Sequence, residues 1–322
     1  MSASADTRTA FIIAAYNAEA TLERAVMSAL AEPETAEVCI VDDASRDGTA
    51  ALAQALAARD PRVSVHILPA NAGPAAARNL AIARTTSPWL TILDADDYVL
   101  PGRLTRLHAE AHEADFIGDA LIRRREGEPL AWSPAPLAPD HLSLTRFLLG
   151  NLGGSQGPLD LGFLKPLMRR SFLDQNGLRY REDMRLGEDY QLYARALAKN
   201  ARFLICGEGG YISVERAGSL SRDHSEIDLQ RLRDCDDDIA RVRELSAPEQ
   251  RALRRHWQSV DRRLQWRRLI SAVKARNAGA ALSTFHSLDA SLYLIAKLAE
   301  QAWLRGSGRG PDRSELSPTP SG

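Results

Sequence analysis

Four short apolar segments rich in β-branched residues recur at nearly equal intervals along the first hundred residues. They begin at Phe11 (FIIAA), Val38 (VCIV), Val63 (VSVHIL) and Trp89 (WLTIL), so successive segments start 27, 25 and 26 positions apart. Each interval leaves room for one helix between two strands. This rhythm constrains the fold strongly, because strands that alternate with helices form a mainly parallel sheet through right-handed crossovers.

The residues between these segments carry helical patterns, at 18–31, 49–58 and 74–84. The first has apolar residues at four-residue steps, and Pro74 opens the third at a position that favours proline. The sequence therefore predicts an α/β fold in which helices flank a mainly parallel sheet.

The rest of the chain is organised differently. Prolines predict a loop at 132–139, glycines follow at 150–158, and from residue 228 the chain is charge-rich with apolar residues at helical spacing. We expect four regions: a sheet-forming half (1–105), a mixed half (106–227), a helical appendage (228–305) and a flexible tail rich in Gly, Pro and Ser (306–322).

Polar side chains follow three of the four predicted strands. They are Tyr16 and Asn17 after the first, Asp42 and Asp43 after the second, and Asp94, Asp96 and Asp97 after the fourth. Ligands of such sheets bind at the carboxyl ends of the strands, so these side chains should converge on one edge. An Asp-x-Asp pair there can hold Mg²⁺ or Mn²⁺ together with water and substrate phosphates. The structural alternative is that aspartates end strands, and that Asp97 caps a helix beginning near Tyr98.

Composition narrows the class of protein. Lys and Arg number 41 against 42 Asp and Glu in 322 residues, which gives no global reason to expect nucleic-acid binding. Cys39, Cys206 and Cys235 are scattered, which argues against a disulfide framework or a zinc knuckle. No signal-peptide pattern and no apolar window of about 18 residues is visible. We expect a cytoplasmic protein that is either soluble or peripheral at the inner face of the cell membrane.

Four further stretches are polar or basic. Glu188 and Asp189 precede a predicted helix. Acidic residues in the first turn of a helix complement its dipole, which is the structural alternative for this pair. A predicted loop at 214–225 gathers Arg216, Ser219, Ser221, Arg222 and His224, and an ordinary solvated loop would explain it too. The segment 162–173 carries Lys165, Arg169 and Arg170, which amphipathicity explains equally well.

The helical appendage is basic and contains Arg254, Arg255, Trp257, Arg262, Arg263, Trp266, Arg267 and Arg268. Such a basic helix could bind an anionic membrane, although a solvated face with buried tryptophans is more common.

Four ordered stretches resemble one known family. FIIAAYNAEATLERAVMSAL, CIVDDASRDGTAALAQ, NAGPAAARNLAIA and LDADDYVLPGRL together resemble the nucleotide-binding half of the inverting glycosyltransferase family 2, whose fold is called GT-A. The later stretch MRLGEDYQLYARAL resembles the catalytic-base motif of that family. The resemblance implies that residues 1–105 bind a nucleotide sugar, and that residues 106–227 bind the acceptor and supply the base.

The resemblance also implies roles for individual residues. Tyr16 and Asp43 would contact the nucleotide base or the ribose, and Arg78 would lie near the nucleotide base. The whole donor-binding set would be Tyr16, Asn17, Asp43, Arg78, Asp94, Arg216, Ser219 and Arg222. The metal would be Mg²⁺ or Mn²⁺ bound by Asp94 and Asp96, with His224 as a further ligand or a phosphate contact. Asp189, beside Glu188, would be the catalytic base, and 162–173 would line the donor sugar and acceptor. Inverting transfer needs a carboxylate that removes the acceptor proton, and a metal that stabilises the departing diphosphate.

Longer runs that include GPAAARNLAIA, GFLKPLMRRSFL and GSLSRDHS resemble bacterial succinoglycan-type exopolysaccharide glucosyltransferases. This implies UDP-glucose as the donor and an oligosaccharide acceptor, which is lipid-linked in many members. Two alternatives remain. A sugar-nucleotide pyrophosphorylase requires a Gly-rich basic loop after the first strand, where this chain has AAYNAEATLERA. A non-catalytic sugar-nucleotide-binding protein predicts a damaged metal or base motif, and both motifs are intact.

Overall fold

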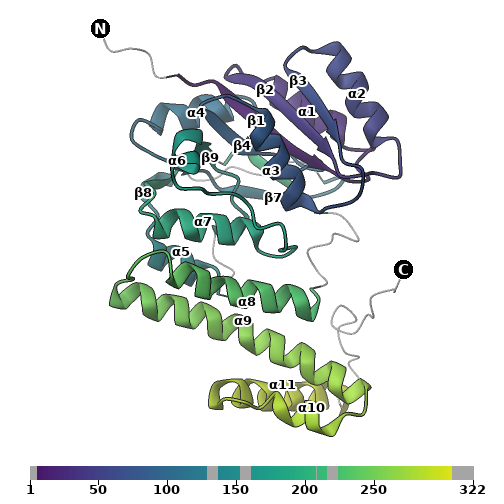
Figure 1. The fold of residues 1–322 in the computed structure, drawn as a ribbon, viewed down its shortest axis with the longest axis vertical. Helices are drawn as coiled ribbons and strands as arrows, with labels where there is room; N and C mark the ends of the chain where they lie inside the picture. Colours follow the sequence, from purple (N-terminus) through teal and green to yellow (C-terminus); the bar gives the residue numbers. More distant parts are fainter. Residues whose placement is uncertain (1–5, 129–136, 153–160, 208, 216–223, 307–322) are drawn as a thin grey trace.

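The computed structural model describes residues 6–128, 137–152, 161–207, 209–215 and 224–306, and an eight-stranded sheet forms its centre (Figure 1). From edge to edge its strands are β3 (Val63–Ile67), β2 (Thr35–Asp42), β1 (Thr9–Ala15), β4 (Trp89–Ile92), β9 (Leu167–Arg169), β6 (Phe116–Gly118), β10 (Phe203–Gly207) and β8 (Leu137–His141). Only β9 and β8 run antiparallel to their neighbours. One sheet therefore continues across the expected boundary at residue 105.

Side chains of the central strands alternate between two apolar cores. Ile12 of β1 faces one core and Phe11 and Ile13 face the other, and all three are fully buried. Burial on both faces explains why these strands read as continuous apolar runs.

Helices cover both faces of the sheet. The first face carries α1 (Leu22–Leu30), α2 (Thr49–Arg59) and α4 (Arg103–Glu110). The second face carries α3 (Pro74–Arg84), α5 (Leu144–Gly150), the 3-10 turn η1 (Leu161–Phe163), α6 (Arg170–Gln175) and α7 (Glu188–Ala198). Together with the sheet, they make the expected three-layer α/β arrangement.

A second, three-stranded sheet lies beside the end of β4. Its order is β5 (Tyr98–Val99), β11 (Tyr211–Glu215) and β7 (Leu121–Arg125), with β11 antiparallel to β5 and parallel to β7. The segment that leaves β4 is therefore paired with a strand more than a hundred residues later in the chain.

The C-terminal region is helical, as expected, and its helices are stacked below the sheet layers in Figure 1. They are α8 (Glu226–Ala240), α9 (Ala247–Lys274), α10 (Ala278–Ser283) and α11 (Leu288–Gly306). Ser225 and Ser246 begin α8 and α9 with capping boxes. The apolar faces of α8 and of much of α9 belong to the core under α7, whereas α10 and α11 pack on α9.

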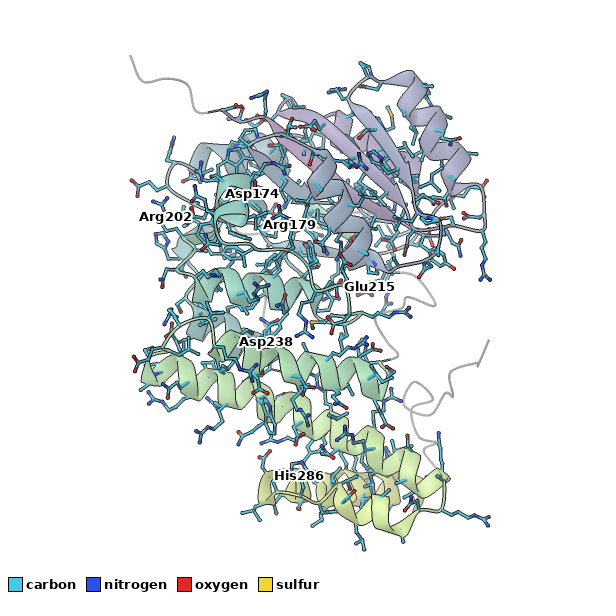
Figure 2. All side chains as sticks on the ribbon, in the orientation of Figure 1. Asp174, Arg179, Arg202, Glu215, Asp238 and His286 are labelled. Carbon is cyan, nitrogen blue, oxygen red and sulfur yellow. The ribbon has the colours of Figure 1, made fainter. Side chains whose placement is uncertain are left out.

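Asp238 near the end of α8 accepts a hydrogen bond from Arg181, at 2.7 Å, and Figure 2 labels it on this helix layer. None of the described helices has the length and apolar character needed to cross a bilayer.

The structure confirms the four strands and the helix at 74–84. The helix expected at 18–31 begins only at Leu22, because residues 18–21 form a turn after Asn17, whose φ is 50°. The loop expected at 132–139 lies outside the described residues up to 136, and from Leu137 the chain is strand β8. Most of the Gly-rich stretch at 150–158 also lies outside them.

The structural alternative in which Asp97 caps a helix at Tyr98 does not hold. Tyr98 begins strand β5, and the carboxylate of Asp97 bonds to β11 instead of to a helix N-terminus. Tertiary pairing with a distant strand explains the difference, because no local pattern in the sequence reports it.

Candidate active site

Hydrogen bonds connect the loops that follow the carboxyl ends of β1 and β2. The backbone N–H of Asn17 donates to Ser45 Oγ at 3.0 Å, and Asn17 Oδ1 accepts from the Arg46 N–H at 2.9 Å. Asn17 and Ala44 both have positive φ, at 50° and 57°. Tyr16 is 42% exposed at this edge. The two strand ends thus form a rigid rim that leaves the Tyr16 ring open to a ligand.

Asp43 organises the loop that leads into α3. Its two carboxylate oxygens accept from the N–H groups of Ala72 and Gly73, at 2.7 and 2.9 Å, and its side chain is buried. Gly73 has a φ of 90°, a conformation that disfavours any other residue. Asp43 therefore shapes the rim, and these backbone bonds fix the direction in which its carboxylate faces.

Arg78 joins the two halves of the chain at the centre of this edge. Its guanidinium is 2.8 Å from Asp94 Oδ1, 2.8 Å from Glu188 Oε1 and 3.6 Å from Asp189 Oδ1. Arg78 comes from α3 and is buried, and its guanidinium also lies over the Tyr180 ring at 5.3 Å. The structure thus places Arg78 among the acidic side chains of both halves.

Lys165 lies beside Arg78 and is the residue whose importance the sequence did not reveal. Its Nζ is 3.0 Å from Asp94 Oδ2 and 2.8 Å from Asp189 Oδ2, and the side chain is 5% exposed. Its position is fixed from behind, because its carbonyl accepts from Arg103 Nη2 at 2.6 Å. The only sequence signal was a lysine inside the apolar run GFLKPLM.

The other two basic residues of that run are not in the site. Arg169 donates to the carbonyls of Ala111 and Ala114, and Arg170 donates to the carbonyls of Ser87 and Ile82. Both therefore have structural roles at the sheet, and Lys165 alone of the three reaches the carboxylates.

The charges of this cluster support one another. Burial alone would raise the pKa of Asp94, but the charges of Lys165 and Arg78 outweigh it and hold that pKa well below its ordinary value. Burial would lower the pKa of Lys165, and the charges of Asp189 and Asp94 raise it instead. Removing one member of such a buried set leaves an uncompensated charge, typically at a cost of about 3 to 5 kcal/mol.

Asp189 stands in the first turn of α7, directly after Gly187 and Glu188. Gly187 has a φ of 74°, and a Cβ there would lie 2.6 Å from Leu232 Cδ1, so any side chain at this position would be strained. Asp189 is buried, and its Oδ1 accepts no hydrogen bond from any described residue. The tight turn therefore places a buried carboxylate whose Oδ2 is held by Lys165 at 2.8 Å and whose Oδ1 lies 3.6 Å from the Arg78 guanidinium.

Asp97 and Tyr211 lock the chain around the Asp-x-Asp segment. The Tyr211 hydroxyl donates to Asp97 Oδ2 at 2.8 Å and accepts from the Asp94 N–H at 3.0 Å, and the Val214 N–H donates to Asp97 Oδ1 at 2.8 Å. Burial, followed by the charges of Asp94 and Asp96, raises the pKa of Asp97 to about 7. Asp97 is thus a positioning group for its neighbours.

Asp94 and Asp96 remain the predicted ligands of a hard divalent cation at this edge, and both carboxylate oxygens of Asp94 are paired here, with Arg78 and Lys165. The Asp96 carbonyl accepts from Arg24 Nη2 at 2.6 Å, which fixes its backbone, and its side chain is partly exposed. No group of three or more His, Cys, Asp or Glu in the described ranges is placed to hold a metal ion, and the role of His224 as a further ligand stays a prediction. Two carboxylates match Mg²⁺ or Mn²⁺, which take their remaining ligands from water and substrate phosphates.

Part of the expected site falls outside the description. Arg216, Ser219, Ser221 and Arg222 lie in the segment 216–223, outside the described residues. His224 lies just before α8 and is partly buried. Their expected roles at the donor diphosphate remain predictions.

Comparisons with known proteins place the chain in a family. The family model "Glycosyl transferase family 2" matches residues 10–175. The succinoglycan biosynthesis protein ExoU of Rhizobium meliloti is 44% identical over 87% of this chain and 83% of its own, and ExoO of the same species is 36% identical over 85% and 80%. A GalNAc(5)-diNAcBac-PP-undecaprenol beta-1,3-glucosyltransferase of Campylobacter jejuni is 29% identical over 44% of this chain and 48% of its own.

Solved structures with little sequence identity share the fold. TarS 1–349 of S. aureus in complex with UDP-GlcNAc is 19% identical, with a TM-score of 0.61 over 87% of this chain and 91% of that chain. The mannosyltransferase PcManGT of Pyrobaculum calidifontis in complex with GDP-Man and Mn²⁺ is 16% identical, with a TM-score of 0.56 over 94% and 83%. With the GT-A fold, the family match over half of its length and the extended identity to ExoU, this chain belongs to glycosyltransferase family 2 and is a glycosyltransferase.

Proposed function

We propose that this glycosyltransferase moves glucose from UDP-glucose, with inversion at the anomeric carbon, to a lipid-linked exopolysaccharide oligosaccharide. One structural observation carries the proposal: Lys165 Nζ lies between the Asp189 and Asp94 carboxylates, at 2.8 and 3.0 Å, and brings the two acids together at the end of the sheet. A base next to the donor-binding aspartates is the arrangement that inverting transfer requires. The family membership, which disfavours the pyrophosphorylase alternative, supports the same reaction class.

The reaction follows from these positions. The acceptor hydroxyl donates to Asp189 Oδ1 and loses its proton there as its oxygen bonds to the anomeric carbon. The bond from that carbon to the diphosphate oxygen breaks, and UDP leaves with the electron pair. Attack from the face opposite the diphosphate converts an α-linked donor into a β-linked product. The cations of Lys165 and Arg78 hold the carboxylates in place during this step.

Asp96 and Asp94 would hold Mg²⁺ or Mn²⁺ at the donor diphosphate. The bound ion would supply charge stabilisation for the departing UDP. Tyr16, Asn17 and Asp43 lie at the ends of β1 and β2, where a nucleotide base and ribose would bind in a parallel sheet. This agrees with the donor-binding roles that the family resemblance implies.

The donor and acceptor classes rest on relatives. ExoU and ExoO are named for succinoglycan biosynthesis, and the Campylobacter relative is named for glucose transfer to an undecaprenol-linked acceptor. These names favour glucose as the transferred sugar and a lipid-linked exopolysaccharide intermediate as the acceptor. The TarS complex holds UDP-GlcNAc, which makes that donor the main competitor.

Calorimetric titration with a panel of nucleotide sugars tests the donor. We expect UDP-glucose to bind more tightly than UDP-GlcNAc, UDP-galactose and GDP-mannose when Mn²⁺ is present, and binding to weaken strongly with chelator. Tighter binding of UDP-GlcNAc, UDP-galactose or GDP-mannose than of UDP-glucose would overturn the proposed donor.

A further inference from the structure

The last helix, α11, has an apolar outer face. Four large apolar residues lie on this face and are 56 to 78% exposed: Leu288, Leu292, Ile295 and Trp303. They follow one another at three- or four-residue steps, with Ala299 filling the longer interval between Ile295 and Trp303. The opposite face, which packs against α9, carries Ala290 and Leu294, and both are buried. A solvent-facing helix normally keeps polar residues outside, so this exposed stripe indicates a binding surface.

The helices that carry this stripe are strongly basic. Residues 247–306, from α9 to the end of α11, contain eleven Lys and Arg against four Asp and Glu, a net charge of +7. The whole chain carries −1, so the remainder is acidic. Such a charge asymmetry indicates an anionic partner for this end of the molecule.

Exposed arginines share one side of α9 with α11. Arg262 Nε donates to Asp289 Oδ2 at 2.8 Å, which places the start of α11 on the Arg262 side of α9. Arg251 and Arg255 lie eleven and seven residues before Arg262, on the same helical stripe, and are exposed. Figure 1 shows α10 and α11 at the end of the molecule farthest from the sheet. The apolar ridge and the arginines thus face the same surroundings.

Some of the basic and aromatic α9 residues noted in the sequence contact other side chains of the protein, and others are exposed. Arg262 pairs with Asp289, Arg268 donates to Gln230, and the Trp257 ring is covered by Arg233 at 5.4 Å. Arg254 and Arg255 are exposed. The aromatic residue available to a partner is therefore Trp303 of α11, and the tryptophans of α9 are not fully exposed.

We propose that the outer face of α11 lies in the headgroup region of an anionic bilayer, with Arg251, Arg254 and Arg255 against the lipid phosphates. A second copy of the chain would bring a second positive surface and so be repelled, and nucleic acid would leave the apolar stripe in water. An anionic lipid surface satisfies both features at once. This inference deepens the proposed function, on which it rests, by naming how the enzyme meets a lipid-linked acceptor.

Vesicle flotation tests the surface with the full chain. The vesicles are phosphatidylcholine alone or phosphatidylcholine with phosphatidylglycerol, at low and high salt. The first variant carries Leu292→Gln and Ile295→Gln, and the second carries Arg251→Gln, Arg254→Gln and Arg255→Gln. Met27→Gln, which changes an exposed apolar residue of α1 on the sheet layer, is the matched control.

We expect binding to phosphatidylglycerol vesicles only, weakened by salt. The arginine variant should bind about 100-fold more weakly, since each basic side chain near an anionic surface contributes roughly a factor of five. The Leu292 and Ile295 variant should lose at least about tenfold, and Met27→Gln should bind normally. Circular dichroism confirms that each variant is folded.

Three outcomes overturn the inference. They are no flotation of the wild-type protein with anionic vesicles, unchanged flotation of either variant, and a concentration-dependent dimer in sedimentation velocity that the Leu292 and Ile295 variant abolishes. Flotation needs no donor or acceptor, so its failure is distinct from failure of the proposed transferase reaction, which nucleotide-sugar titration reports.

Discussion

Lys165 Nζ lies 2.8 Å from Asp189 Oδ2, so a buried lysine holds the carboxylate that we propose as the catalytic base. The same nitrogen contacts Asp94, which links the base to the donor-binding end of the sheet. Because Lys165 is anchored by the bond from Arg103 to its carbonyl, the base is positioned from the sheet as well as from its own helix. The pair therefore couples the two halves of the site.

Lys165→Met should lower kcat by about 10- to 100-fold and also raise the donor KM, because Asp189 and Asp94 both lose the cation that orients them. Lys165→Arg should recover part of kcat, which a purely structural role would not require. Steady-state kinetics checks both variants, with the melting temperature as a control for folding. A normal kcat in a folded Lys165→Met protein would contradict the positioning role.

Asp189→Asn should preserve binding of UDP and Mn²⁺ but reduce transfer by about 10² to 10⁴, because an amide does not accept the acceptor proton. Asp183→Asn is the matched control, since Asp183 is a partly exposed carboxylate in the same loop region, paired with Arg181 at 2.6 Å. Near-normal turnover of Asp189→Asn would remove the base assignment.

Asp96→Ala should abolish the metal-dependent part of UDP binding. The carboxylate oxygens of Asp96 and Asp94 are the hard ligands at this edge, and UDP phosphates would share the ion with them. Calorimetry with Mn²⁺ and then with chelator separates this part from the rest. If the variant binds UDP as the wild-type protein does under both conditions, the two aspartates are structural.

Tyr211→Phe should destabilise the fold by about 1 to 3 kcal/mol and weaken donor binding, because it removes the donor to Oδ2 of buried Asp97 and the acceptor of the Asp94 N–H. Tyr190→Phe is the control, since its hydroxyl is equally buried but bonds to Asp236 in the helical core. Chemical denaturation and UDP titration measure the two effects. Equal loss of UDP affinity in both variants would argue for general destabilisation instead.

Local patterns explain how far the sequence could predict this molecule. Pro74 at a first helical position and the continuous apolar run of β1 each indicate one element directly, so the strands and the α3 helix were predictable. Asp97 was misread because its partner, β11, lies more than a hundred residues away. Lys165 was not assigned because one lysine in an apolar run does not indicate the two carboxylates it meets in space.

The outer face of α11 was missed for a related reason. Leu288, Leu292 and Ile295 have the spacing of a core-facing stripe, and only the buried Leu294 on the opposite side shows that they face outward. When a helix is apolar on two faces, the spacing of its apolar residues does not show which face is buried.

Transfer of radiolabelled glucose from UDP-glucose into a lipid extract of the cells that make the protein tests the central claim most directly. The account predicts that wild-type enzyme with Mn²⁺ labels the lipid fraction, that a β-glucosidase and not an α-glucosidase releases the label, and that Asp189→Asn gives only background. Label released by an α-glucosidase, or equal labelling by the Asp189→Asn variant, would contradict it.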